Sequence, residues 1–255
     1  MHRVRIIFKP KTELKLSPQR LSVALHGFLM QEIEPAYADY LHQQSVNPYS
    51  TYVARLDEKT YAWEVNMLTG ESYQVFHQAL DRLRDSSFEL KLQGGIQCQV
   101  LGLDWQDYDL QEASRSFYQE EAPARYVLHF ESPTAFKQAG QYVIFPDIRL
   151  IYQSILLKYQ AFDQPEEELD EEFLNLLVAS TSIRRYRLQS QYLKVHTVAI
   201  NGFVGSLEIQ VKANRTLKNY IRYMLGFAEY SGVGIKASIG MGKLRLEEVD
   251  RREQR

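Results

Sequence analysis

Six histidines are the side chains of this 255-residue sequence best suited to moving protons near neutral pH, because an unperturbed imidazole titrates close to neutrality. They are His2, His26, His42, His77, His129 and His196. No two of them stand at zinc-ligand spacing on one predicted helix. The single cysteine, Cys98, falls in a strand-like segment, where packing is its expected role. The sequence therefore predicts no metal site, no cofactor and no intramolecular disulfide.

Four glycines in the segment 231–243, SGVGIKASIGMGK, form a second feature with chemical potential. Backbone without side chains can approach a phosphate or another part of the fold closely. The segment is not a P-loop, because Gly242-Lys243 is followed by Leu244 rather than by serine or threonine. It is not a dinucleotide fingerprint either, because that motif opens a helix, whereas this segment is predicted to follow one. Contact with an RNA backbone and packing alone are the two remaining interpretations.

Charge is distributed unevenly along the chain. Residues 1–180 carry 16 Lys and Arg against 26 Asp and Glu, whereas residues 181–255 carry 14 against 6. Such asymmetry favours a polyanionic partner for the C-terminal part, although a solvated basic face is the alternative. The N-terminus has no apolar signal core, and no uncharged run approaches the length of a membrane span. A cytoplasmic protein without membrane contact is expected.

The first half of the chain is predicted to have the element order β-α-β-β-α-β. A strand at 4–8 precedes a helix that begins at Ser17-Pro18, and Glu34-Pro35 separates it from a short helix over 36–43. Two strands flank a turn at Glu58-Lys59, a helix spans 72–85, and a β-rich stretch covers 88–103. This order is the ferredoxin-like pattern.

The second half repeats that pattern with additions. Strands are predicted in RYVLHFES and QYVIFP, and helices in 148–159 and in FLNLLVAS. The alternating segment 184–211 predicts antiparallel strands with a turn near Asn201-Gly202 or Gly205. A helix over 214–230 then leads into the glycine segment and a final strand, KLRLEEV. The predicted fold is α+β: two tandem ferredoxin-like (RRM-like) domains, 1–122 and 123–255, with a C-terminal glycine-rich loop.

Together these features resemble the CRISPR-associated endoribonucleases of the sixth Cas family, which belong to the RAMP superfamily and cut repeat RNA into guide RNAs. The spacing G-x-G-x-K-x-S-x-G-x-G over 232–242 matches the glycine loop of that family, and ADYLHQQSVNPYS matches the region of its usual catalytic histidine, here His42. HGFL and FAEYSGVG are also similar. The family's tyrosine and lysine positions fall on Met30 and near Pro48, so its Tyr-His-Lys triad is not present as such. The resemblance then favours a two-histidine variant with His26 as partner of His42 or as phosphate stabiliser.

The reaction implied by the resemblance is a metal-independent transesterification. The ribose 2′-OH attacks the neighbouring phosphate, leaving a 2′,3′-cyclic phosphate and a 5′-OH. His42 would act as acid or base. His26 could instead be a histidine packed at the edge of the core. The protein would act as a monomer or homodimer and could pass its product to a CRISPR effector complex.

Basic residues of the second half and residues of the glycine loop are predicted to hold RNA phosphates or an A-form RNA stem. They are Arg184, Arg185, Arg187 and Lys194 on the predicted strands, Arg215, Lys218 and Arg222 on the last helix, and Gly232, Gly234, Lys236, Ser238, Gly240 and Gly242 in the glycine loop. Two rival functions stay open. One is a non-catalytic RNA-binding subunit of a CRISPR effector complex with the same fold, and the other is a ferredoxin-like enzyme that acts on small molecules.

Overall fold

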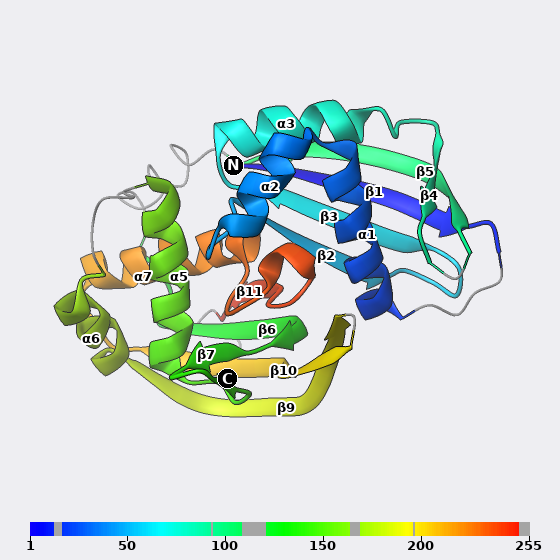
Figure 1. The fold of residues 1–255 in the computed structure, drawn as a ribbon. Helices are drawn as coiled ribbons and strands as arrows, with labels where there is room; N and C mark the ends of the chain where they lie inside the picture. The colour runs from blue at the N-terminus through cyan, green and yellow to red at the C-terminus, as the bar shows by residue number, and fades with distance from the viewer. Residues whose placement is uncertain (13–16, 93, 109–120, 164–168, 196, 250–255) are drawn as a thin grey trace. The chain divides into compact units, whose positions relative to one another are not determined.

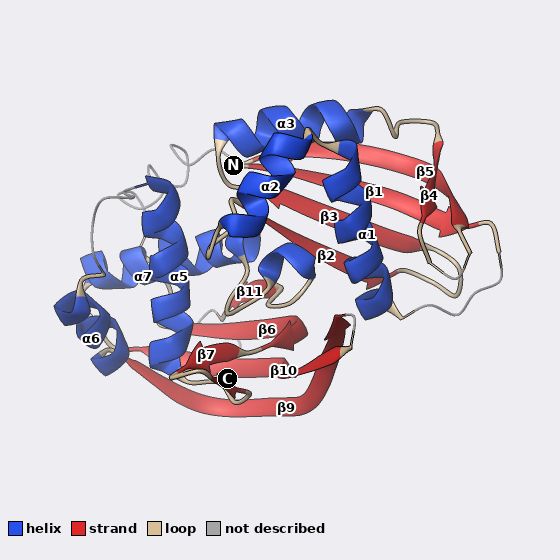
Figure 2. Ribbon diagram, in the orientation of Figure 1, coloured by secondary structure: helices blue, strands red, loops and turns tan. Residues whose placement is uncertain are grey.

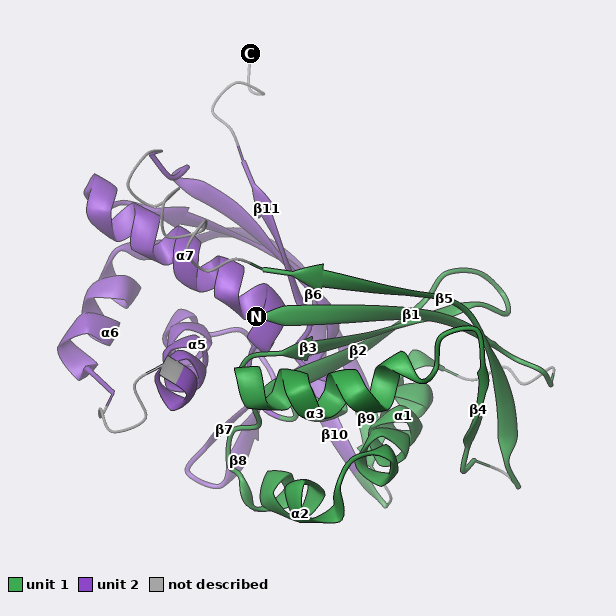
Figure 3. Cartoon of the chain, turned by 90° about the horizontal axis from the view of Figure 1, so that it is seen from above, with its two compact units in different colours: residues 1–108, 193–198, 236–240 green, residues 109–192, 199–235, 241–255 purple. Residues whose placement is uncertain are grey.

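A computed structural model describes residues 1–255 apart from 13–16, 93, 109–120, 164–168, 196 and 250–255. The chain forms two compact units (Figure 3). Unit 1 comprises residues 1–108, 193–198 and 236–240, and unit 2 comprises residues 109–192, 199–235 and 241–255. Two short segments of the second half of the sequence therefore belong to unit 1. The domain boundary expected at 122/123 stays a prediction.

Unit 1 is built on a five-stranded sheet in the order β2-β3-β1-β5-β4 (Figure 1). Its strands are β1 (His2–Pro10), β2 (Tyr49–Arg55), β3 (Tyr61–Met67), β4 (Ser87–Leu90) and β5 (Ile96–Asp107). All neighbouring strands are antiparallel, and the register of β1 against β3 sets Val4 opposite Val65. Both valines are fully buried, so the alternation of side chains commits one face of each strand to the core.

Three helices complete unit 1: α1 (Pro18–Glu32), α2 (Pro35–Gln43) and α3 (Gly70–Asp81). The Ser17 side chain accepts the backbone N–H of Arg20 and so caps α1, as its place before Pro18 predicts. Pro35 occupies the first turn of α2, where its missing amide loses no hydrogen bond. A reciprocal capping box between Thr69 and Ser72 starts α3 two residues before the predicted position.

Helix α1 is fixed on the sheet by a stripe of leucines at helical spacing. Leu21, Leu25 and Leu29 have no exposed surface and share one apolar cluster with Val4 and Ile6 of β1. Burial of each such side chain contributes about 1.5–3 kcal/mol. The polar side chains of α1 are therefore presented from a rigidly packed element.

Unit 2 contains a four-stranded sheet in the order β11-β6-β10-β9, with helices packed beside it (Figure 2). The main strands are β6 (Arg125–Thr134), β9 (Thr181–Val195), β10 (Val198–Val211) and β11 (Leu244–Glu248), and β7 (Phe136–Gln138) pairs with β8 (Gln141–Val143). The helices are α5 (Ile148–Asp163), α6 (Glu171–Ala179) and α7 (Arg215–Ser231). A short 3₁₀ turn, η1 (Ala237–Ile239), follows α7 and belongs to unit 1.

Both sheets have the same connectivity. The first strand of unit 1, β1, lies between β3 and β5, and the first strand of unit 2, β6, lies between β10 and β11. In each unit a helix-containing segment follows the first strand, a hairpin comes next, and a helix precedes the last strand. This is the βαββαβ arrangement of a ferredoxin-like fold. The predicted α+β class is confirmed.

The long hairpin β9–β10 differs from the prediction at its turn. The two strands end and begin at residues 195 and 198, so Asn201, Gly202 and Gly205 lie inside β10 and not in the turn. A Cβ at Gly202 would lie 2.6 Å from the Thr134 oxygen, and one at Gly205 would lie 2.1 Å from the Arg187 oxygen. The register of β10 against β6 shifts near Gly205. These glycines therefore mark close strand approach and a bulge.

No helix in the described part of the chain is long and apolar enough to cross a membrane.

Candidate active site and nucleic-acid interface

His26 lies on α1 with its ring turned toward strand β2. Its Nδ1 atom and the hydroxyl of Tyr49 are hydrogen-bonded at 3.1 Å. Tyr49 is only 1% exposed, and burial raises the pKa of its phenol above the usual range, so the hydroxyl keeps its proton. A buried neutral hydroxyl thus holds one nitrogen of a half-buried imidazole.

The turn η1 is held against the same part of unit 1 by Ser238. The Thr51 hydroxyl donates to the Ser238 carbonyl at 3.2 Å, and the Asn47 side-chain amide donates to the Ser238 hydroxyl at 3.4 Å. A backbone hydrogen bond of Ser238 also acts on His26. Ser238 was predicted as an RNA contact. It is 9% exposed, and its polar groups are engaged by Asn47, Thr51 and His26.

The electrostatics of His26 bring three predicted site residues together. Its pKa is lowered from 6.5 to about 4, first by burial, then by the nearby His42 and to a smaller extent by Lys236, while the Ser238 hydrogen bond acts in the opposite direction. At neutral pH the His26 imidazole is therefore uncharged. We call His26, His42, Tyr49, Lys236 and Ser238 the histidine cluster.

His42 and Lys236 are the solvent-facing members of the histidine cluster. His42 lies in the last turn of α2, and its side chain is exposed. Lys236 is also exposed and has a left-handed backbone conformation, with φ 59° and ψ 31°, immediately before η1. The exposed imidazole of His42 can exchange protons with a substrate. The exposed ammonium group of Lys236 can attract the phosphate of that substrate.

The glycines of the loop are required by its packing within each unit. Gly240 has φ 98°, and an added Cβ would lie 2.0 Å from the Ser22 hydroxyl oxygen on α1. Gly242 has φ 72°, and an added Cβ would lie 2.0 Å from the Val233 carbonyl oxygen. These positions support the packing interpretation that the sequence left as an alternative to RNA contact. Contact of the loop glycines with RNA stays a prediction.

The start of the loop is tied to helix α5. The Gly234 amide donates to the Ser154 hydroxyl at 2.7 Å, and Lys158 donates to the carbonyls of Ser231 and Gly232 at 3.1 and 2.8 Å. Lys158 is 8% exposed, and burial lowers its pKa to about 7. Sequence reasoning did not single out this lysine, because a basic residue in an amphipathic helix normally faces solvent.

The predicted basic residues of β9 are all exposed. Arg185 forms an ion pair with Glu208 on β10, whose side chain is largely buried. Arg184 and Arg187 form no ion pair with any described residue. Lys194 lies in the part of the hairpin that belongs to unit 1 and is exposed as well.

The predicted basic stripe of α7 is largely paired with carboxylates. Lys218 bonds to Glu121 at 3.1 Å, and Arg222 bonds to Glu248 at 2.6 Å. Both glutamates lie outside the segment 181–245. Acidic residues near the basic stripe in the sequence are few, but these two are brought to it by the fold. The charge that α7 offers to a phosphate is correspondingly smaller than the composition of the segment indicated.

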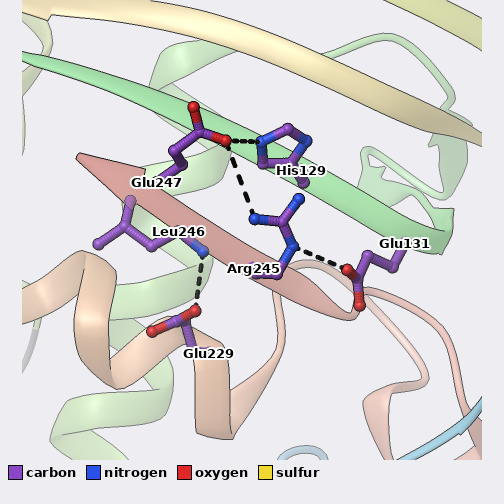
Figure 4. A network of polar contacts seen from close by, with 6 residues as sticks. All are labelled: His129, Glu131, Glu229, Arg245, Leu246 and Glu247. Carbon is purple, nitrogen blue, oxygen red and sulfur yellow. Dashed lines mark hydrogen bonds and ion pairs between the residues drawn. The ribbon is translucent and has the colours of Figure 1, made fainter. Parts of the chain in front are cut away.

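His129 has a structural partner, and Cys98 lies in the core, as the sequence predicted for this cysteine. His129 Nε2 bonds to Glu247 at 2.8 Å, beside a bond of 3.0 Å from Arg245 to Glu131 and one of 2.8 Å from the Leu246 amide to Glu229 (Figure 4). Cys98 is fully buried, and burial raises its pKa to about 12, so its thiol is not a nucleophile at neutral pH. His196 lies outside the described residues.

Comparison with solved structures agrees with this fold. A Cas6 product complex matches with a TM-score of 0.75 at 24% identity, covering 97% of this chain and 100% of the other. Cas6 from Thermus thermophilus matches with a TM-score of 0.71 at 18% identity, covering 96% and 98%. A protein described as a RAMP protein binding different RNA substrates matches with a TM-score of 0.63 at 13% identity, covering 97% and 100%. At these identities the likeness shows a shared fold.

Sequence comparison shows the family. The family model for CRISPR-associated endoribonuclease Cas6 matches residues 128–244. A CRISPR-associated endoribonuclease Cas6 from Streptococcus thermophilus is 38% identical over 230 residues, covering 90% of this chain and 93% of the relative. Its counterpart from Mycobacterium tuberculosis strain CDC 1551 is 35% identical over 233 residues, covering 90% and 73%. Identity at this level over nine tenths of the chain confirms the resemblance inferred from the glycine loop, and the protein belongs to the family of CRISPR-associated endoribonucleases named Cas6.

Proposed function

We propose that this Cas6 protein cleaves CRISPR repeat RNA by metal-independent transesterification and so releases guide RNAs. The 2′-OH beside the scissile phosphate attacks the phosphorus, the bond to the 5′-oxygen breaks, and the products carry a 2′,3′-cyclic phosphate and a 5′-OH. The observation that carries this proposal is the histidine cluster, where His42 and Lys236 both act electrostatically on the His26 ring although Lys236 lies far from both histidines in the sequence.

His42 is the acid–base residue of the proposed reaction. Its imidazole is exposed at the end of α2 and can therefore reach a phosphodiester that lies on the surface of unit 1. Imidazole exchanges protons efficiently near neutral pH, whether it takes the proton of the 2′-OH or gives one to the leaving 5′-oxygen. The nucleophile belongs to the substrate, so the chemistry does not depend on a metal-activated water.

Lys236 supplies positive charge for the transition state. The pentacoordinate phosphorane carries more negative charge on its oxygens than the starting diester, and a fixed ammonium group stabilises that charge. The Lys236 side chain is exposed, yet its charge is felt by the His26 ring. Its backbone is fixed from the C-terminal side by the hydrogen bonds of Ser238 to Thr51 and Asn47.

His26 is a positioning residue in this scheme. The ring is neutral at pH 7, bonds to the Tyr49 hydroxyl and shares a hydrogen bond with the Ser238 backbone. These bonds join α1, β2 and η1, which is the element that presents Lys236. A histidine occupied in this way holds the loop in place and leaves proton transfer to His42.

The pKa of His26 makes stability depend on pH in a defined direction. Its folded pKa of about 4 lies below the ordinary 6.5, so the unfolded chain binds the proton more tightly. The contribution of His26 is complete above pH 6.5 and is lost as the pH falls toward 4. With one pKa unit equal to about 1.4 kcal/mol, the loss at pH 4.5 is of the order of 2–3 kcal/mol.

Urea unfolding of the wild type and of His26→Gln at pH 7 and pH 4.5 measures this contribution. Glutamine keeps a polar side chain but has no proton to gain in this range. We expect the stability advantage of the wild type over His26→Gln to shrink by about 2–3 kcal/mol between the two pH values. A difference that stays constant with pH would show that His26 is not held neutral by its surroundings.

A non-catalytic RNA-binding subunit is the second candidate function, since Arg184 and Arg187 on β9 are exposed and form no ion pair with a described residue, whatever the role of the histidines. The substrate partner is repeat RNA under either function. Transfer of the product to an effector complex and a monomeric or homodimeric state are parts of the same proposal. Incubation of the protein with the repeat RNA of its own genome separates the two candidates, because the rival binds this RNA and leaves it uncut.

A further inference from the structure

Helix α5 carries a buried lysine that takes no part in the proposed reaction. Lys158 is 8% exposed, and its Nζ atom donates to the carbonyls of Ser231 and Gly232 at 3.1 and 2.8 Å. Lysine is almost never buried to this degree without a partner, because its charge is costly to remove from water. An apolar side chain would fill the same space without that cost, but it could not bind the two carbonyls. The bonds of Lys158 therefore indicate a role beyond packing.

These two bonds do not depend on the charge of Lys158. Burial lowers the pKa of Lys158 from 10.5 to about 7, so its ammonium and amine forms coexist at neutral pH. Either form has enough N–H groups for two carbonyls. The carbonyls belong to the last residue of α7 and to its C-cap, where the backbone has no acceptor role left within the helix. Lys158 thus closes the end of α7 in both forms.

The helix that carries Lys158 is held firmly within unit 2. Ile155 has no exposed surface, and the hydroxyl of Tyr152 is hydrogen-bonded to the hydroxyl of Thr181 at 2.9 Å. Tyr159 packs edge-on against Phe227 of α7, with ring centroids 5.4 Å apart. Both helices belong to the same compact unit (Figure 3). The polar side chains of α5 therefore extend from a fixed support.

A second side chain of α5 holds the residues that follow α7. The Gly234 amide donates to the Ser154 hydroxyl at 2.7 Å, and the Ile235 amide donates to the Ala135 carbonyl at 2.9 Å. Ser154 precedes Lys158 by four residues, so the two side chains lie on one face of the helix. We call Ser154 and Lys158 the α5 clamp. All residues that the clamp holds, 231–235, belong to unit 2 as α5 does.

We propose that Lys158 is a positioning residue for RNA cleavage, which together with Ser154 fixes the backbone that leads into Lys236. Lys236 follows Ile235 directly in the chain. A charged group stabilises a transition state best where it is held in place, and a misplacement of about 1 Å can cost about 100-fold in rate. The proposal rests on the proposed function in taking Lys236 as the group that stabilises the phosphorane. The clamp itself can be measured without RNA.

Amide hydrogen exchange of the full chain without RNA tests the clamp. Lys158→Met keeps a long unbranched side chain in the buried site but removes the donor of the two carbonyls. We expect the amides of residues 232–235 to exchange about tenfold faster than in the wild type or more, because a hydrogen bond from a charged donor contributes at least this factor. The amides of β1, in unit 1, should keep their wild-type rates. Wild-type exchange at 232–235 would overturn the proposal.

Ser154→Ala tests the clamp with a smaller change. It removes one hydroxyl from α5 and is expected to speed exchange at the Gly234 amide, whose acceptor is lost. This variant decides the question if Lys158→Met does not fold, which circular dichroism checks. Wild-type exchange at Gly234 in Ser154→Ala would overturn the role of the clamp.

A double-mutant cycle tests whether the clamp acts through Lys236. Lys158→Met is expected to slow single-turnover cleavage of repeat RNA by about 10- to 100-fold, with a smaller change in the dissociation constant of the RNA. In a Lys236→Ala background the same substitution should cause no further loss, because a residue that acts through Lys236 then has nothing to position. General damage to the fold would slow cleavage equally in both backgrounds, and that result would overturn the positioning role.

Arg149→Met is the matched control on the same helix. Arg149 is exposed and is bonded to Glu171 and to Asn175, so the substitution removes a basic side chain from α5 without touching the clamp. Loop exchange and cleavage should both stay at the wild-type rate. Cleavage by Lys236→Ala at the wild-type rate would contradict the proposed function at Lys236, whereas wild-type cleavage by Lys158→Met alone would overturn only the positioning role of Lys158.

Discussion

Replacing His42 with alanine is expected to slow cleavage of the repeat RNA by about 100- to 10,000-fold while the RNA stays bound, because one acid–base group contributes a factor of this size. The side chain is exposed in the last turn of α2, so its removal leaves the core of unit 1 intact. The measurement is the single-turnover cleavage rate with protein in excess over labelled repeat RNA, together with the dissociation constant from the same preparation.

His77→Ala is the matched control for this experiment. His77 also lies on a helix of unit 1, but its ring packs on Tyr73 and Trp105, at centroid distances of 5.1 and 4.5 Å. Its removal should leave the cleavage rate unchanged. Cleavage by His42→Ala at the wild-type rate would show that His42 does not transfer the proton.

Gly242→Ala is expected to destabilise the protein by about 2–5 kcal/mol. A left-handed backbone costs a residue with a Cβ about 1–2 kcal/mol, and overpacking adds about 1–3 kcal/mol. Gly242 has φ 72°, and the new Cβ would lie 2.0 Å from the Val233 carbonyl oxygen, which belongs to backbone and cannot rotate away. This loss is a large part of the stability of a typical domain, about 5–15 kcal/mol. Chemical denaturation measures it.

The matched control is Gly140→Ala in the same unit. Gly140 has φ 81°, but no atom lies within 4 Å of an added Cβ. Backbone strain alone then predicts a loss of about 1–2 kcal/mol. If the two variants were equally stable, close packing around Gly242 would not be the reason for glycine at this position.

Most of the fold could be predicted from the sequence because its signals are local. The leucines of α1 recur at helical spacing, Ser17 and Pro18 mark its first turn, and the alternation along β1 shows which face is buried. The turn of the long hairpin could not be placed in this way. Position 202 needs a glycine because a Cβ there would collide with the backbone of Thr134, a residue far away in the sequence. In the sequence alone, such a glycine cannot be told from a glycine in a turn.

The candidate site was predictable in part. His26 and His42 could be named from residue type and from the resemblance to a family, but the electrostatic effect of Lys236 on His26 depends on how η1 packs. The roles of Tyr49 and Thr51 in holding His26 and Ser238 depend on the same packing. The pairing of α7 with Glu121 and Glu248 was missed because the charge count covered only neighbouring sequence.

Cleavage of the repeat RNA by the wild-type protein in excess EDTA, with analysis of the product ends, tests the metal-independent mechanism most directly. We expect the rate in EDTA to equal the rate in magnesium, because in the proposed mechanism the attacking oxygen comes from the RNA and Lys236 stabilises the charge on the phosphorane. The products should carry a 2′,3′-cyclic phosphate and a 5′-OH. Loss of cleavage in EDTA, or products with a 5′-phosphate, would contradict the mechanism.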